Sequence, residues 1–149
     1  GIPMKGRSWV VVANKEKAKI YRVAKVGEFE EVASFIHPDG TMKKGTEYYS
    51  ERPSRAFDRV GVGRHSIEPE TSLDEKRSAV FAHLIADFLR ASQMRGDFEF
   101  LYVAAEPRFL GFIRRLWPKE LTSRIDESVS KDIVGEPPQS VWEHLKITV

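Results

Sequence analysis

Four arginines lie close together in one part of the chain, and a single acid, Asp58, lies among them. A guanidinium group presents parallel N–H donors that match the oxygens of a phosphate, so this grouping favours contact with a phosphate backbone. The glycines beside the last arginine would let the backbone approach a ligand closely. The predicted phosphate-binding residues of this segment are Arg52, Arg55, Arg59, Gly61, Gly63, Arg64 and His65. The alternative is internal pairing, because residues 37–72 hold six basic and six acidic residues.

A second group of cations follows the sequence Ala104-Ala105-Glu106-Pro107-Arg108, and no acid interrupts it. The apolar residues before it predict a buried strand and Pro107 predicts the first position of a helix. Ligands of α/β proteins gather at such strand ends, where a helix dipole favours anions. We therefore predict a basic, phosphate-binding face at Arg108, Arg114, Arg115 and Lys119. The alternative is a helix start followed by an ordinary solvated face.

Arg64 and His65 also permit a catalytic interpretation, in which the chain hydrolyses an ester or phosphoester of RNA. The guanidinium would stabilise a developing anion and the imidazole would act as the base. A histidine in such a segment more commonly lies in solvent and has no chemical role. No two of the four histidines have the spacing of metal ligands, so no metal is expected. Gly61-Val62-Gly63 lacks the strand-turn-helix context of a dinucleotide site, so no cofactor is expected either.

These residues need a scaffold, and the hydrophobic pattern predicts an α/β fold with a mixed sheet flanked by helices. Three strands that form an antiparallel meander are predicted at residues 8–13, 18–23 and 28–36. Residues 37–72 show no period and are predicted to be a long loop. The remainder alternates helix, strand, helix, strand, helix, with strands at 98–104 and 124–129, which indicates parallel βαβ-type units. The last strand is partly polar and is predicted at an edge.

The clearest helix is predicted to begin at Ser72, with Glu75 completing a capping box, and to end at Gly96. Its buried face is predicted from apolar residues at helical spacing. They are Val80, Phe81, Leu84, Ile85, Phe88 and Leu89. The final helix begins at Glu136-Pro137-Pro138 and is predicted to bury Val141, Trp142 and Leu145.

Length and composition indicate one cytoplasmic domain. The 149 residues suit a single α/β domain at 8–149, and residues 1–7, with Gly1-Ile2-Pro3 before Met4, are interpreted as a tag remnant and N-terminal tail. The chain contains no cysteine, which excludes disulfides and thiolate metal sites. It lacks an apolar run of membrane-spanning length, so no membrane contact is expected. The formal net charge is only +2, so the placement of charge must carry any argument for nucleic acid.

Two sequence blocks, SERPSRAFD at 50–58 and GVGRHSIEP at 61–69, resemble the signature of the bacterial family described as "protein required for attachment to host cells". Weaker matching blocks lie at 9–13, 18–21 and 104–111. That family is similar to the middle domain of archaeal and eukaryotic peptide-chain release factors, where a Gly-Gly-Gln loop promotes peptide release. Residues 61–65 stand in its place without glutamine, since Gln93 and Gln139 are the only glutamines.

The resemblance implies a release-factor-like fold and a protein that binds the ribosome or structured RNA without glutamine-dependent release. Three functions therefore stay open at this point. The first is an RNA- or ribosome-associated binding module, and the second is the hydrolase that uses Arg64 and His65. The third is a protein-interaction factor in attachment to host cells. The oligomeric state is not indicated by the sequence.

Overall fold

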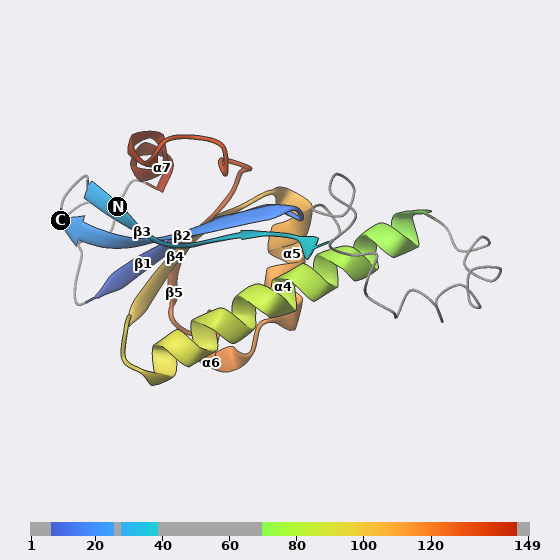
Figure 1. The fold of residues 1–149 in the computed structure, drawn as a ribbon, viewed down its shortest axis with the longest axis horizontal. Coiled ribbons are helices and arrows are strands. Elements are labelled where there is room, and N and C mark those ends of the chain that lie inside the picture. The colour runs from blue at the N-terminus through green and yellow to red at the C-terminus, as the bar shows by residue number, and fades with distance from the viewer. Residues whose placement is uncertain (1–6, 26–27, 39–69, 146–149) are drawn as a thin grey trace.

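A five-stranded mixed sheet forms the centre of the protein in the computed structural model, which describes residues 7–25, 28–38 and 70–145 (Figure 1). The strand order is β3-β2-β1-β4-β5, with β2 antiparallel to β1 and β3, and β4 parallel to β1 and β5. The predicted meander and parallel units are both confirmed. The strands are β1 (Ser8–Ala13), β2 (Lys17–Lys25), β3 (Glu28–Ile36), β4 (Phe100–Ala105) and β5 (Ile125–Ser130).

The helices cover both faces of the sheet, three on one side and one on the other (Figure 1). The first face carries α4 (Glu70–Met94), α5 (Pro107–Leu116) and α6 (Lys119–Thr122), and the second carries α7 (Pro138–Leu145). No helix in the described ranges is long and apolar enough to cross a membrane.

Strand β1 lies at the centre of the sheet, and all six of its residues are buried. Alternate side chains enter two separate cores, because successive side chains of a strand point to opposite faces. Trp9 and Val11 pack under α4 and α5, whereas Val10 and Val12 pack under α7. This explains why a continuous apolar run, rather than an alternating one, stands at residues 9–13.

The long helix α4 differs from the prediction in two places. It begins at Glu70, so Ser72 lies inside the helix and is not its N-cap. Val80 is 54% exposed, because the buried side of the helix is centred on Phe81, Ile85 and Leu89 instead. Small residues complete that buried side, namely Ser78, Ala82, Ala86 and Ser92.

The end of α4 is as predicted. Gly96 has a φ of 80°, a left-handed conformation that glycine adopts at no steric cost. The N–H of Gly96 donates to the carbonyl of Gln93, at 2.9 Å, and the N–H of Asp97 donates to that of Ser92, at 3.0 Å. These bonds turn the chain sharply, so that β4 can run back through the core beside β1.

Strands β3 and β5 are the two edges of the sheet, and the predicted edge position of residues 124–129 is confirmed. Strand β3 carries a bulge, since Ile20 pairs with Ala33 and Tyr21 with Glu31, which leaves Val32 without a partner in the ladder. A bulge and exposed glutamates interrupt a long edge and so discourage pairing with other chains.

Candidate functional site

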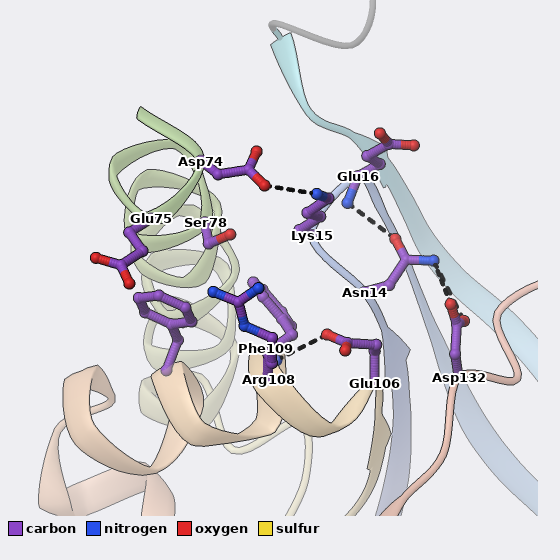
Figure 2. Close-up of a pocket in the computed structure, with 11 residues that line it drawn as sticks. Asn14, Lys15, Glu16, Asp74, Glu75, Ser78, Glu106, Arg108, Phe109 and Asp132 are labelled. Atoms are coloured by element: carbon purple, nitrogen blue, oxygen red, sulfur yellow. Dashed lines mark hydrogen bonds and ion pairs between the residues drawn. The ribbon is translucent and has the colours of Figure 1, made fainter. Parts of the chain in front are cut away.

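A polar pocket lies at the carboxyl ends of β1 and β4, where the two parallel strands finish side by side (Figure 2). Its volume is about 320 Å³. The walls come from the β1–β2 turn, the start of α4, the start of α5 and one residue after β5 (Figure 2). The lining residues are Asn14, Lys15, Glu16, Asp74, Glu75, Ser78, Glu106, Arg108, Phe109, Phe112 and Asp132.

Asn14 holds the β1–β2 turn in shape. Its Oδ1 accepts hydrogen bonds from the main-chain N–H groups of Glu16 and Lys17, both at 2.8 Å, which is the usual asparagine turn. Its Nδ2 donates to the two carboxylate oxygens of Asp132, at 3.2 and 3.1 Å. The turn after β1 is thus tied to the segment after β5, on the far side of β4.

Lys15 extends from the same turn to helix α4. Its Nζ lies 2.8 Å from a carboxylate oxygen of Asp74, and the Arg77 guanidinium lies 3.5 Å from the other oxygen. The hydrogen bond from Lys15 lowers the pKa of Asp74 despite partial burial, and the charges of Lys15, Arg77 and Arg108 lower it further. This pair forms the upper rim of the pocket in Figure 2.

Glu106 caps helix α5 and occupies the anion position at its start. Its Oε1 accepts a hydrogen bond from the N–H of Phe109, at 3.0 Å, while its own N–H donates to the carbonyl of Ala13, at 3.1 Å. Pro107 follows at the first helical position, as predicted. Because the chain's own carboxylate already satisfies this helix end, an external anion would need other donors.

Arg108 supplies such a donor. Its side chain is exposed, and Figure 2 shows its guanidinium directed from α5 toward α4 and Lys15. It forms no salt bridge or hydrogen bond with any described residue, although its charge lowers the pKa of Asp74. A guanidinium without a carboxylate against it can bind an anionic ligand without first breaking an internal pair.

Ser78 is one of the residues of this pocket that the sequence did not reveal. The residue is only 5% exposed, yet it lines the pocket, and its hydroxyl has no hydrogen-bond partner among the described residues. A serine in the interior of a helix normally returns a hydrogen bond to a carbonyl four residues earlier, as Ser92 does to Phe88 at 3.0 Å. Its buried position on the α4 stripe, three residues before Phe81, was the available signal.

The other predicted cations lie along α5 and α6, and all three are exposed. Arg115 places its guanidinium carbon 4.8 Å from the centre of the Phe112 ring. Residues four and seven positions after Arg108 share its side of a helix, so Arg108, Phe112 and Arg115 form one stripe. Arg114 lies elsewhere on the helix and donates to the Ser128 hydroxyl at 3.2 Å. Lys119 begins α6 and has no ion-pair partner in the described part of the chain.

The predicted residues of the first arginine group lie outside the described residues. They are Arg52, Arg55, Arg59, Gly61, Gly63, Arg64 and His65, which include both catalytic candidates. Pro38 and Glu70, which bound that segment, are described. Among the described residues, histidines and acids do not gather in any group of three or more that would hold a metal ion.

Comparison with known proteins supports part of the predicted resemblance. The family model of proteins required for attachment to host cells matches residues 9–145, which is nearly the whole chain. The chain therefore belongs to that family. A comparison with the curated proteins finds no match.

Proposed function

We propose that this member of the family required for attachment to host cells acts in the cytoplasm by binding the phosphate backbone of RNA. The binding surface consists of four exposed cations of α5 and the start of α6, namely Arg108, Arg114, Arg115 and Lys119. The family description gives the coarse role, attachment to host cells. RNA binding is the molecular activity that we add to it.

One observation carries the proposal: none of these four cations is paired with a carboxylate of a described residue. Most of the arginines elsewhere in the described ranges are paired, for example Arg22 with Glu30, Arg90 with Glu120 at 3.6 Å and Arg95 with Asp97 at 3.0 Å. Four unpaired cations on two consecutive helices favour a ligand that carries several negative charges. Phosphate backbones carry repeated negative charges, and their oxygens match the guanidinium fork.

The stacking of Arg115 on Phe112 adds to this argument. A side chain held against a ring loses less rotamer freedom when it binds a ligand, so the guanidinium is partly preorganised. The ring itself offers an apolar surface to an unstacked base, as in proteins that bind single-stranded nucleic acid.

The predicted resemblance to release-factor middle domains points to the ribosome as the RNA partner. The proposal does not depend on the arginines of residues 52–64, which lie outside the described residues. Peptide release is not proposed, because the segment contains no glutamine.

The test is binding of the full chain to a fluorescent single-stranded RNA and to ribosomes, by anisotropy and co-sedimentation. The variant Arg108→Gln/Arg115→Gln removes two charges from α5 and should weaken binding about tenfold or more. The matched control is Lys25→Gln/Arg124→Gln. It removes two exposed charges at the end of the sheet that lies opposite the carboxyl ends of β1 and β4. Equal affinity of the two double variants, or no binding by the wild type, would overturn the proposal.

A further inference from the structure

The pocket at the carboxyl ends of β1 and β4 has a place in the sheet that α/β proteins use for small ligands. The chain leaves β1 for β2 on one side, whereas it leaves β4 through α5 for β5 on the other side. The two connections depart in opposite directions, so a crevice forms between the strand ends. Its volume of about 320 Å³ is at the lower end of small-molecule sites, which span roughly 300–1,000 Å³.

Two donors in this crevice have no partner in the described part of the chain. Arg108 directs its guanidinium into it, and Ser78, a residue only 5% exposed, lines its wall with a hydroxyl that no described residue bonds (Figure 2). A hydroxyl that opens into a pocket and has no partner in the protein can donate a hydrogen bond to a ligand there. A guanidinium and a hydroxyl together are typical donors to a phosphate.

Four of the five acids that line the crevice are turned away from Arg108 or bound by another side chain, and the fifth is Glu106. Figure 2 shows the carboxylates of Glu16 and Glu75 turned away from Arg108. Asp74 is bound by Lys15 and Asp132 by Asn14. The pocket therefore presents Arg108 with little competition, although its lining contains more acids than bases.

Two further groups suit the rest of a nucleotide. Glu106 uses Oε1 for the N–H of Phe109, and its second oxygen has no hydrogen-bond partner among the described residues, so it can accept from a sugar hydroxyl. The Phe112 ring lines the same cavity and can pack against a base. Inorganic phosphate would contact neither Glu106 nor Phe112, and a sugar alone would not neutralise the Arg108 charge. A nucleotide would use all of these groups.

The geometry points to this pocket as a binding site for a single nucleoside monophosphate, with its phosphate on Arg108 and Ser78, its ribose at Glu106 and its base against Phe112. This site is distinct from the backbone-binding surface of α5, although both use Arg108 and the Phe112 ring. It takes a free mononucleotide and needs neither Arg114 nor Lys119.

The test is calorimetric titration of the full chain with AMP, GMP, CMP and UMP, and with adenosine and inorganic phosphate for comparison. At least one monophosphate should bind, and it should bind roughly tenfold or more tightly than adenosine or inorganic phosphate. Ser78→Ala and Arg108→Gln should each weaken it by roughly tenfold or more, as expected for hydrogen bonds to a charged group. The controls are Ser123→Ala and Arg124→Gln, at exposed positions outside the pocket.

Three results would overturn the site. They are no monophosphate binding at millimolar concentration, inorganic phosphate binding as tightly as the nucleotide, and unchanged affinity in Arg108→Gln. Arg108 is exposed, so its variant decides the matter even if Ser78→Ala does not fold. RNA titration of Ser78→Ala separates the two proposals, because a failed nucleotide site leaves RNA binding unchanged and a failed RNA surface leaves monophosphate binding unchanged.

Discussion

Swapping the side chains of Asn14 and Asp132 tests whether the contact between them stabilises the turn after β1. Asn14→Asp keeps an oxygen that accepts from the N–H groups of Glu16 and Lys17, at 2.8 Å. It replaces the amide nitrogen, which lies 3.1 and 3.2 Å from the two Asp132 carboxylate oxygens, with a second oxygen. That oxygen then faces the Asp132 carboxylate. A hydrogen bond is lost and two like charges are brought together.

The expected cost follows from those two changes. A hydrogen bond to a charged group contributes about 1.5–3 kcal/mol, and the lower end applies because both side chains are partly in solvent. Repulsion between the carboxylates adds about 1 kcal/mol in a watery surrounding. Asn14→Asp should therefore lower the free energy of unfolding by roughly 2.5 kcal/mol at pH 7.

The exchanged pair, Asn14→Asp with Asp132→Asn, should restore stability to within about 0.5 kcal/mol of the wild type. It returns one amide and one carboxylate to the contact, and the amide oxygen introduced by Asp132→Asn can still accept from the N–H of Val134, as the Asp132 carboxylate does at 3.4 Å. Urea denaturation of the wild type, both single variants and the exchanged pair measures this, provided that the m-value stays constant. If the exchanged pair is no more stable than Asn14→Asp alone, the contact does not hold the turn.

Four other substitutions test the frame of the pocket, two glycines and the core. The lowered pKa of Asp74 means that its bond to Lys15 stabilises the fold above the ordinary carboxyl pKa of about 3.9 and is lost as the pH falls through the lowered value. Thermal melts of wild type and Asp74→Asn should differ by up to about 1 kcal/mol at pH 7 and converge in acid. In urea denaturation, Gly96→Ala should lower the free energy of unfolding by roughly 1–2 kcal/mol, because the φ of Gly96 is 80°. Gly111→Ala should raise it by roughly 0.5–1 kcal/mol, because Gly111 lies inside α5 with open space where the methyl group would go. Trp117→Phe removes the indole N–H that donates to the main-chain carbonyl of Ala82 in α4, at 3.0 Å. Calorimetry should show that the free energy of unfolding falls by about 2 kcal/mol. The exposed substitution Met94→Leu is the control and should change it little.

The fold was largely predictable because its elements carry strong local signals. The continuous apolar run at 9–13 indicated a strand with both faces buried, and it is the central strand. Pro107 and Gly96 marked helix ends through their backbone chemistry, which does not depend on distant residues. The prediction for Val80 was wrong because it considered only large apolar side chains. The buried side of α4 also includes small residues such as Ala82.

The pocket was predictable only in part, because its contacts join residues far apart in sequence. The turn before α5 and Arg108 were identified from local patterns. The contacts of Asn14 with Asp132 and of Lys15 with Asp74 span 118 and 59 residues, and no periodicity encodes such pairs. Asn14 did carry one usable signal, since it follows a buried strand directly and so lies at the strand end where ligand sites form.

The most direct test of the central claim is the salt dependence of RNA binding. A single-stranded RNA held by Arg108, Arg114, Arg115 and Lys119 should give a plot of log affinity against log salt with a slope near −3, because each phosphate contact contributes about −0.7. Arg108→Gln/Arg115→Gln should reduce the magnitude of that slope by about 1.4, while Lys25→Gln/Arg124→Gln should leave it unchanged. A slope that is flat in the wild type, or the same in both double variants, would contradict the account.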